Sequence, residues 1–175
     1  MAIDFLSSRV EPLADHHDKT GFSCGIDSLD KYLQLHAGQD IRRSVAATFV
    51  MVTQDKPAEI LGYYTLSSTA IDPGELEAGV RKKLPPYPLI PATLIGRLAR
   101  DKRYMAVGIG EHLLIDALNR CFQHSGEIAS FAVVVDAIDD RAHSWYADKW
   151  GFLTLLARRD RLYLPMKTIE KLMPK

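Results

Sequence analysis

The sequence predicts a layered α/β (α+β) fold, a mixed sheet flanked by helices, and two observations favour this class. Runs rich in β-branched residues alternate with segments of helical periodicity, and some of these runs are joined by turns while others are bridged by helices. The chain has 175 residues, 47% hydrophobic and 25% charged, which is enough to bury one core. We therefore expect a single domain over residues 1–175.

The first third of the chain predicts a helix followed by a hairpin. Asp27 is expected to cap the helix, whose apolar face recurs at helical spacing through Leu29, Tyr32, Leu33, His36 and Ala37. Residues 47–53 and 60–70 are typical of strands, and Asp-Lys-Pro at 55–57 is typical of a turn. The two strands are therefore expected to pair as a hairpin.

The middle of the chain predicts a connector, a strand and a long helix. Residues 75–83 favour a short helix. The four prolines of residues 84–91 fix backbone angles and remove amide donors, so this segment is expected to be a stiff connector and neither helix nor central strand. Residues 92–99 predict an apolar strand. Gly108 then opens a helix with Leu113, Leu114, Ala117, Leu118 and Cys121 along one face.

The last third predicts a buried strand over residues 128–137, because Phe-Ala-Val-Val-Val is rich in β-branched side chains. A helix over residues 139–149 is expected to end at Gly151. The remaining elements are a final hairpin and a short terminal helix, at residues 152–156, 161–164 and 166–172.

The loop that leads into the helix at Gly108 favours an anion site. A strand that feeds a helix presents unpaired amides and the positive end of the helix dipole, and Gly108 and Gly110 allow close approach to the main chain. A Rossmann fingerprint would need glycine where Leu113 stands, and the Gly-Lys-Ser/Thr of a Walker loop is absent. The spacing leaves two interpretations: the pyrophosphate loop of an acetyl-CoA enzyme, or a purely structural glycine pair.

The run G-R-L-A-R-D-K-R-Y-M-A-V-G-I-G at residues 96–110 resembles the cofactor-binding motif of the GNAT acetyltransferases. More specifically, it is similar to the GNAT toxins of bacterial toxin–antitoxin pairs. Further matches follow in the order of that family and extend over nearly the whole chain: F-S-C-G at 22–25, L-G-Y-Y-T-L at 61–66, I-P-A-T-L-I-G-R-L-A at 90–99 and R-A-H-S-W-Y-A-D-K-W-G-F at 141–152.

The resemblance implies a central twisted sheet that splays at the acetyl-CoA site, with acetyl-CoA as the co-substrate. Its strand before the loop would offer main-chain groups to the pantetheine arm through Leu98, Ala99 and Arg100. Asp139 stands where many such enzymes have an asparagine that contacts this arm, and it is equally suited to cap a helix. The pyrophosphate would be bound by Arg103, Met105, Ala106, Val107, Gly108, Ile109 and Gly110.

The chain departs from the family pattern at Met105 and Ala106, where Gln or Arg followed by Gly is usual. Met105 has no side-chain donor, and Ala106 is expected to require a backbone conformation that suits an L-residue. Arg103 is expected to compensate with its charge. Binding is expected to persist, because it depends chiefly on main-chain amides.

Tyr146 stands at the position of the family's catalytic tyrosine, which would return a proton to the departing CoA thiolate. The alternative is a core aromatic beside Trp145 and Trp150. A phenol with a pKa of about 10 can protonate a thiolate whose acid has a pKa of about 8.5 when the two are held together. The strand before the loop has no Glu or Asp that could act as a base. An α-amine, with a pKa of about 7.7–8.0, needs a base less than a lysine at about 10.4, so an α-amine acceptor is expected.

The toxin resemblance implies acetylation of the amino acid carried by tRNA and hence inhibition of translation. It also implies a homodimer and a ribbon-helix-helix antitoxin as partner. Contacts to tRNA phosphates are expected from Arg97, Lys82 and Lys83, with Arg100 and Arg103. Two alternatives remain: a non-toxin GNAT enzyme that acetylates a small amine or a protein N-terminus, and an inactive acetyl-CoA-binding module.

Composition limits the other classes. Lys+Arg and Asp+Glu number 22 each, so net charge gives no argument for nucleic acid. No segment reaches the roughly 18–20 apolar residues of a membrane span, and neither a secretion signal nor a disulfide framework is evident, so a cytoplasmic location is expected. No metal is expected, because the adjacent His16 and His17 should point apart. Cys24 and Cys121 are expected to pack as small apolar residues.

Overall fold

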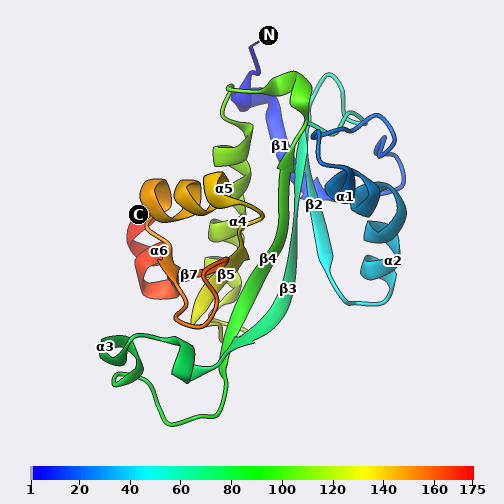
Figure 1. The fold of residues 1–175 in the computed structure, drawn as a ribbon. Coiled ribbons are helices and arrows are strands. Elements are labelled where there is room, and N and C mark those ends of the chain that lie inside the picture. The colour runs from blue at the N-terminus through cyan, green and yellow to red at the C-terminus, as the bar shows by residue number, and fades with distance from the viewer. Residues whose placement is uncertain (1) are drawn as a thin grey trace. The chain divides into compact units, whose positions relative to one another are not determined.

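The computed structural model describes residues 2–175, whose strands form a mixed sheet (Figure 1). Its seven strands lie in the order β1 (Ser8–Pro12), β2 (Ala47–Thr53), β3 (Gly62–Ile71), β4 (Ile90–Arg100), β5 (Ala132–Asp136), β7 (Arg161–Pro165) and β6 (Leu153–Thr154). The chain divides into two compact units. The first unit comprises Met1–Ser67 and Gly96–Ala117, and the second comprises Ser68–Ile95 and Leu118–Lys175, so β3 and β4 contribute residues to both. The expected single domain over residues 1–175 stays a prediction.

Strands β1, β2 and β3 pair antiparallel in the first unit. β1 pairs with β2 from Ser8 opposite Thr53 to Pro12 opposite Phe49. β2 pairs with β3, which confirms the expected hairpin. The sequence pattern does not predict β1, because Ser-Arg-Val-Glu-Pro has little apolar alternation. An edge position explains why a strand forms there, since charged residues and proline are tolerated at the edge of a sheet.

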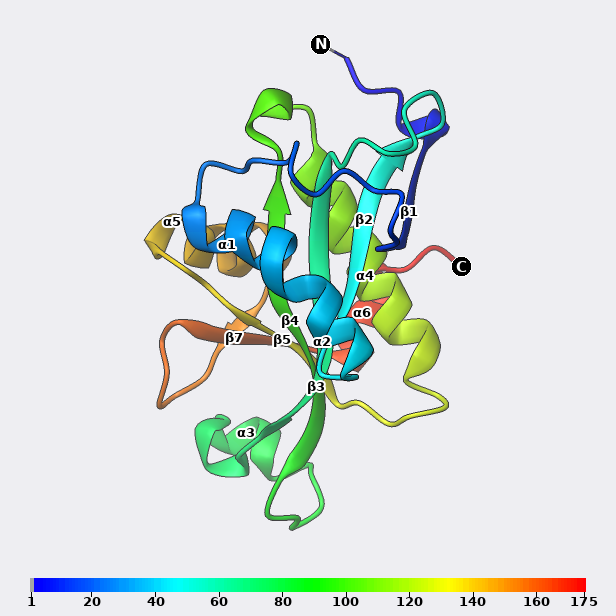
Figure 2. The same ribbon diagram turned by 90° about the vertical axis from the view of Figure 1, so that its right-hand side faces the viewer.

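One face of β2 is covered by a continuous helical stretch (Figure 2). It consists of α1 (Asp27–Lys31), a π-helical turn (Tyr32–His36) and α2 (Ala37–Arg42). The expectation that Asp27 caps this helix is wrong. Ile26 occupies the cap position, and Asp27 lies in the first turn. There its negative charge interacts favourably with the positive end of the helix dipole, and its Oδ2 atom lies 2.9 Å from Nζ of Lys31. The core of the first unit comprises Phe22, Tyr32, Leu33, Ala37, Val50, Val52, Ile60, Tyr63 and Ala99.

The opposite face of the sheet in the first unit is covered by the first turns of α4 (Ile109–His124), which follow Gly108 as expected (Figure 1). Gly62 permits their close approach to β3. A Cβ atom at residue 62 would lie 2.7 Å from Cδ1 of Leu113 and 2.9 Å from the carbonyl oxygen of Ala99, and both distances are too short for a real contact. The absence of a side chain at Gly62 therefore sets where α4 begins relative to β3 and β4.

In the second unit, β4 and β5 are parallel, from Ala92 opposite Ala132 to Ile95 opposite Val135. β5 pairs antiparallel with β7, and β7 with β6, which confirms the final hairpin. β4 is longer than predicted and continues past this ladder to Arg100, whereas β5 is shorter than predicted. The core of the second unit comprises Ile71, Leu76, Ile90, Ala92, Ala132, Val134, Leu155 and Tyr163.

The expectation that residues 84–91 contain no central strand is wrong for the last two residues of this segment, because Ile90 and Pro91 begin β4. Pro91 is accommodated because it precedes the first residue of β4 that pairs with β5. Its carbonyl oxygen accepts the amide of Phe131 at 2.8 Å. Pro91 thus contributes to the sheet as an acceptor although it has no amide to donate.

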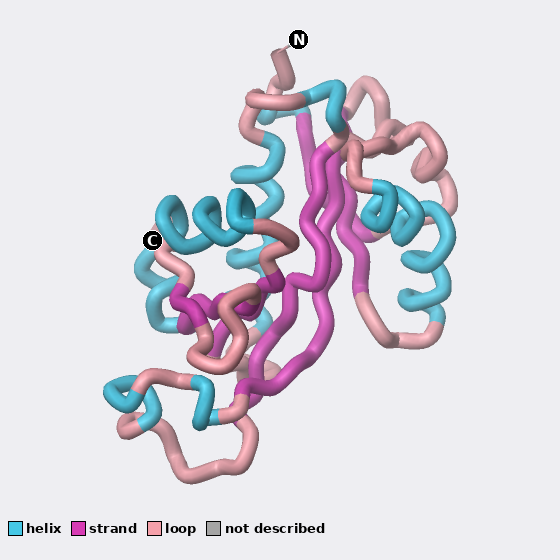
Figure 3. The backbone as a smooth tube through the Cα atoms, in the orientation of Figure 1, coloured by secondary structure: helices cyan, strands magenta, loops and turns pink. Residues whose placement is uncertain are grey.

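Apart from the end of α4, the helices of the second unit are short. The connection from β3 to β4 is mostly loop, with a 3-10 turn (Pro73–Glu75) and α3 (Ala78–Arg81) in place of the longer helix that the sequence predicts (Figure 3). α5 (Asp140–Ser144) continues into a π-helical turn (Trp145–Lys149), and α6 (Met166–Leu172) has the predicted bounds. Within residues 2–175, every helix falls short of the length and apolar character that crossing a membrane requires.

Candidate active site

The anion loop, residues 105–110, follows a 3-10 turn (Lys102–Tyr104) and runs into the first residues of α4. Two of its residues have left-handed backbone angles, Ala106 with φ of 60° and Gly108 with φ of 90°. Turns of this kind aim successive amides to one side, and α4 adds the amides of its first turn and the positive end of its dipole. The geometry is compatible with the anion site that the sequence predicts.

The conformation of Ala106 differs from the expectation. The sequence predicts a backbone that suits an L-residue, and this is wrong, because φ lies in the left-handed region. A left-handed conformation costs an L-residue roughly 1–2 kcal/mol. The loop thus keeps a turn that glycine would adopt without strain, although residue 106 carries a methyl group.

Leu98, Ala99 and Arg100, the residues expected at the pantetheine arm, lie on the part of β4 that follows its last pair with β5. Ala99 is buried in the core of the first unit, and the other two are half-buried. A strand that continues past its neighbour has main-chain groups that a ligand can use. Their contact with the cofactor stays a prediction.

Arg103 is engaged within the first unit. Its Nε and Nη2 atoms lie 2.9 and 3.0 Å from the two carboxylate oxygens of Asp101, and its Nη1 atom lies 3.4 Å from Oε1 of Glu59. Bidentate pairs of this kind are strong and directional. The charge of Arg103 is therefore balanced inside the protein, which gives no support to the expectation that it replaces the donor missing at Met105.

Arg97 has different surroundings. Its guanidinium carbon lies 3.4 Å from the centre of the Tyr32 ring. The Tyr32 hydroxyl donates to Oδ2 of Asp40 at 2.8 Å, and burial together with this bond raises the pKa of Tyr32 to about 12. Arg97 makes no hydrogen bond or ion pair with another residue of the described chain. A guanidinium held over a ring keeps its N–H donors, so Arg97 can receive an anion.

The second unit contains the other predicted site residues, Lys82, Lys83, Asp139 and Tyr146. Both lysines are exposed, directly after α3. Asp139 caps α5, because its Oδ1 atom accepts the amide of Ala142 at 2.7 Å. The N-cap interpretation of Asp139 is confirmed, and its contact with the pantetheine arm stays a prediction.

Tyr146 lies in the π-helical turn, a deviation from the α-helix that is frequent at functional sites. Its side chain is 7% exposed, with the rings of Trp145 and Phe152 edge-on at 5.0 and 5.3 Å. Burial raises the pKa of Tyr146 above the ordinary value for tyrosine. Its hydroxyl forms no hydrogen bond with residues 2–175. The side chain is thus both a core aromatic and a protonated donor without an internal acceptor.

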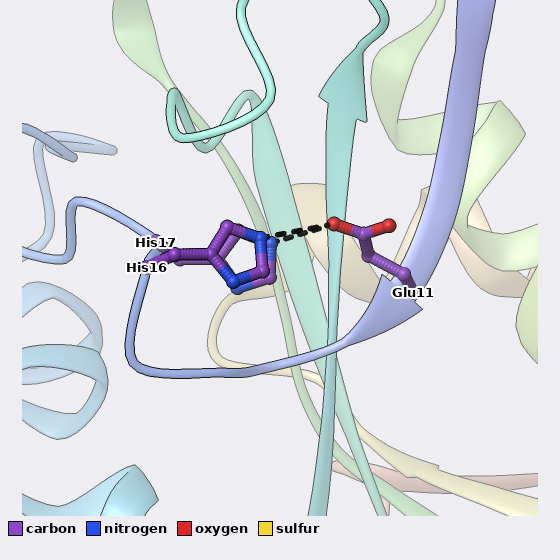
Figure 4. A group of neighbouring side chains, drawn as sticks. All are labelled: Glu11, His16 and His17. Carbon is purple, nitrogen blue, oxygen red and sulfur yellow. Dashed lines mark hydrogen bonds and ion pairs between the residues drawn. The ribbon is translucent and has the colours of Figure 1, made fainter.

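Glu11, His16 and His17 form a cluster that the sequence does not predict (Figure 4). The Nε2 atoms of His17 and His16 lie 2.8 and 3.6 Å from Oε1 of Glu11, and the ring centres are 4.0 Å apart. The expectation that the two histidines point apart is therefore wrong.

The tautomer of His17 explains the arrangement of this cluster. The amide of Ala14 donates to Nδ1 at 2.9 Å, so the proton of the neutral ring is on Nε2 and is donated to Glu11. A metal ion at Nε2 would have to displace this proton. The geometry is that of a carboxylate–imidazole hydrogen bond, and the expectation that no metal is bound stays a prediction.

Both cysteines are poor nucleophiles. Burial raises the pKa of Cys24 to about 11 and that of Cys121 to about 12. Since the thiolate is the reactive form, both side chains remain unreactive thiols near neutral pH. Their geometry is consistent with the packing role predicted from the sequence.

Two residues with roles at the candidate site are not singled out by the sequence interpretation. Tyr32 has the spacing of an ordinary core residue, and Asp101 is one acid among several basic residues. The sequence does contain a signal for Asp101. An aspartate at the end of a strand is suited to cap the next turn, because its carboxylate can accept the main-chain amide two residues further on. No comparable signal identifies Tyr32, whose partner Arg97 is 65 residues away in the sequence.

No protein-family model matches the chain. It is similar to the probable toxin TacT of Sinorhizobium fredii, with 30% identity over 172 residues that cover 94% of each chain. It is also similar to a tRNA-acetylating toxin of Mycobacterium tuberculosis, with 34% identity over 135 residues, 77% of this chain and 78% of the relative.

Three solved structures are similar over nearly their whole length. A tyrosine-to-phenylalanine mutant of KacT has a TM-score of 0.89 and 30% identity, covering 95% of this chain and 99% of its own. AtaT complexed with acetyl-methionyl-tRNAfMet has a TM-score of 0.87 and 28% identity, covering 94% and 98%. A tyrosine-to-phenylalanine mutant of AtaT, bound to the C-terminus of the antitoxin AtaR and acetyl-CoA, has a TM-score of 0.80 and 25% identity, covering 97% and 99%.

Proposed function

The chain belongs to the family of GNAT-type tRNA-acetylating toxins of toxin–antitoxin systems, and from this we propose how its residues carry out the reaction. It is an N-acetyltransferase that uses acetyl-CoA and acetylates aminoacyl-tRNA. The fold class predicted from the sequence is confirmed by the parallel pair of β4 and β5 and by the full-length structural similarity. A relative named as a tRNA-acetylating toxin, and the structure of AtaT with acetyl-methionyl-tRNAfMet, favour the toxin over the non-toxin enzyme and the inactive module.

The anion loop binds the diphosphate of acetyl-CoA in our proposal. Met105, Ala106, Val107, Gly108, Ile109 and Gly110 contribute main-chain amides rather than side chains. The left-handed angles at Ala106 and Gly108 and the start of α4 support this assignment. The mutant of AtaT with bound acetyl-CoA shows that a similar protein takes this cofactor. Leu98, Ala99 and Arg100 then hold the pantetheine arm through β4, and the role proposed for Asp139 at this arm rests on the family resemblance.

Tyr146 donates a proton to the sulfur of coenzyme A as the thioester carbon–sulfur bond breaks. Its raised pKa keeps the phenol protonated at neutral pH, and its hydroxyl is free of internal partners. A free tyrosinate would be unfavourable at this buried position. The phenol therefore regains a proton from the nitrogen that has just been acetylated, so that one proton moves from amine to thiol overall.

The acceptor is the α-amino group of the amino acid carried by tRNA. β4, the strand before the anion loop, contains no carboxylate that could act as a base. An α-amine with a pKa of about 7.7–8.0 is partly neutral without help, whereas a lysine near 10.4 is not. An acetylated α-amine is no longer a nucleophile, so the product cannot accept a growing peptide, and translation is inhibited.

Arg97 contacts a tRNA phosphate, assisted by Arg100, Lys82 and Lys83. The guanidinium held over Tyr32 with unused donors supports this role. Phosphate contacts release counterions, so binding falls as salt rises. Arg103 is left out of this set, since two carboxylates already surround it.

An antitoxin is the expected partner, since an AtaT mutant binds the C-terminus of AtaR. We propose that a ribbon-helix-helix antitoxin binds this chain and that the toxin is a homodimer. Because charged tRNA is its substrate, we also propose a cytoplasmic location.

The decisive experiment incubates the purified chain with labelled acetyl-CoA and total charged tRNA. Mass spectrometry of the released aminoacyl group should show an acetyl group on the α-nitrogen. Label in polyamines but not in tRNA would instead support the non-toxin enzyme. The absence of any calorimetric signal with acetyl-CoA would leave only an inactive module.

A further inference from the structure

A buried carboxylate fastens the segment that leads into the anion loop. Asp101 is 1% exposed, and its carboxylate accepts the main-chain amides of Arg103 at 2.9 Å and Ser23 at 3.1 Å, in addition to the guanidinium of Arg103. The amide of Asp101 donates to the carbonyl oxygen of Leu61 at 2.8 Å. One residue thus joins three segments: the chain before α1, the start of β3 and the turn before the loop.

Glu59 provides a second anchor for the same turn. It lies beside the guanidinium of Arg103, and it accepts a hydrogen bond from the hydroxyl of Tyr104. This bond, together with burial, raises the pKa of Tyr104 to about 12, so the phenol stays protonated and donating at neutral pH. Tyr104 is itself 5% exposed. The residue that directly precedes the anion loop is therefore fixed by its side chain.

The anion loop is fixed at its other end too, because Ile109 is fully buried at the start of α4. Between these ends, Met105 is 56% exposed and Ala106 is held in a strained conformation. The directions of the loop amides then depend on where the two ends are held. Strain at one residue persists only when the surrounding structure determines it.

The charges argue against a direct role for Arg103 at the cofactor. Two carboxylates, Asp101 and Glu59, surround its single guanidinium. A diphosphate would have to compete with a bidentate partner that is almost wholly buried. Removing one partner of such a pair leaves the other unsatisfied, which is costly. The pair is better suited to hold structure than to exchange ligands.

We propose that Asp101 and Arg103 are positioning residues for the diphosphate of acetyl-CoA, which they affect by holding the turn before the anion loop. The inference rests on the proposed function, which assigns the diphosphate to this loop. Neither side chain touches the cofactor. The main-chain amides of the loop make the contacts, and the pair sets their direction.

The test compares two acetyl donors, acetyl-CoA and S-acetylpantetheine, which lacks the diphosphate and nucleotide. In Asp101→Asn, kcat/KM for acetyl-CoA should fall about tenfold or more through KM. The value for S-acetylpantetheine should remain within about twofold, since that donor never reaches the loop. Asp72→Asn is the matched control, because Asp72 caps another 3-10 turn through the amide of Gly74 and should leave both donors unchanged.

Arg103→Lys separates positioning from direct contact and also serves if Asp101→Asn fails to fold. Lysine keeps the positive charge but cannot form the bidentate pair with Asp101. Positioning therefore predicts that Arg103→Lys also loses affinity for acetyl-CoA selectively. In the double variant with Asp101→Asn, the loss should not exceed that of the larger single change.

Three results would overturn the inference: unchanged kcat/KM for acetyl-CoA in both variants, an equal loss for both donors, or fully additive losses in the double variant. Failure of the proposed function would look different. In that case, the wild-type chain itself would show no preference for acetyl-CoA over S-acetylpantetheine.

Discussion

The anion loop and the π-helical turn around Tyr146 differ in the chemical groups that they present to a ligand. The loop offers main-chain amides, and its shape depends on two left-handed residues and on glycine. The turn offers a single hydroxyl on a buried ring. Changes in backbone conformation should therefore alter cofactor affinity, whereas the loss of one oxygen atom should alter turnover.

Tyr146→Phe should have the largest effect. The variant keeps the ring and its packing but lacks the proton donor, so kcat should fall by about 10²- to 10⁴-fold. The dissociation constant for acetyl-CoA, measured by calorimetry, should stay the same. Unchanged turnover would remove Tyr146 from the mechanism, and a matching loss of affinity would break the division between the two regions.

Gly108→Val should weaken cofactor binding. A β-branched residue at φ of 90° is strained by about 1–3 kcal/mol, so the loop should lose its shape, and affinity for coenzyme A should fall about tenfold or more. A Cβ at this position would be 3.6 Å from the ring of Phe5, an ordinary contact, so backbone strain is the main cause. Gly126→Val, in open space, should bind coenzyme A normally.

The pH dependence of kcat/KM for charged tRNA should follow the ionisation of the α-amine acceptor and not that of the Tyr146 phenol. Below about pH 7.7, kcat/KM for charged tRNA should rise about tenfold per pH unit as the α-amine loses its proton. Burial raises the pKa of Tyr146, so the donor stays protonated and no fall is expected as the pH approaches 9. A fall between pH 8 and 9 in initial rates, with the tRNA ester shown to be intact, would contradict this assignment.

Arg97→Gln should raise KM for charged tRNA roughly three- to tenfold and reduce the slope of log affinity against log salt by about one. Tyr32→Phe keeps the ring under the guanidinium and should bind tRNA almost normally. Arg158→Gln, at an exposed arginine paired with Asp160, is the control for loss of a positive charge. If Arg158→Gln has the same effect as Arg97→Gln, the contact is nonspecific.

Ala106→Gly should have the smallest effect. Glycine removes the strain of the left-handed conformation but gains freedom in the unfolded chain, for a net stabilisation of about 1 kcal/mol. The thermal midpoint should rise by roughly 2–4 °C. Ala58→Gly, at an exposed alanine without a left-handed angle, should lower the midpoint instead.

Much of the fold follows from periodicity in the sequence. The hairpin of β2 and β3, the start of α4 and the whole of α6 are predicted because apolar spacing and turn residues are local signals. β1 is missed because its pairing with β2, not its own pattern, makes it a strand. Pro91 is misjudged because its tolerance depends on which residues of β4 pair with β5.

The candidate site is predicted less completely. Gly108 marks the anion loop, because glycine is a local signal for a special backbone conformation. Arg97 and Arg103, six residues apart, look equivalent in the sequence, yet one is held by a tyrosine ring and the other by two carboxylates. Such differences depend on long-range partners. The role of Tyr146 is suggested only by the family resemblance, since a buried aromatic has no distinctive spacing.

A crystal structure of the chain with bound coenzyme A tests the central claim most directly. We expect the diphosphate oxygens within hydrogen-bonding distance of the amides of residues 105–110, and the sulfur within reach of the Tyr146 hydroxyl. Arg103 should remain paired with Asp101. A diphosphate bound elsewhere, or a sulfur remote from that hydroxyl, would contradict the account.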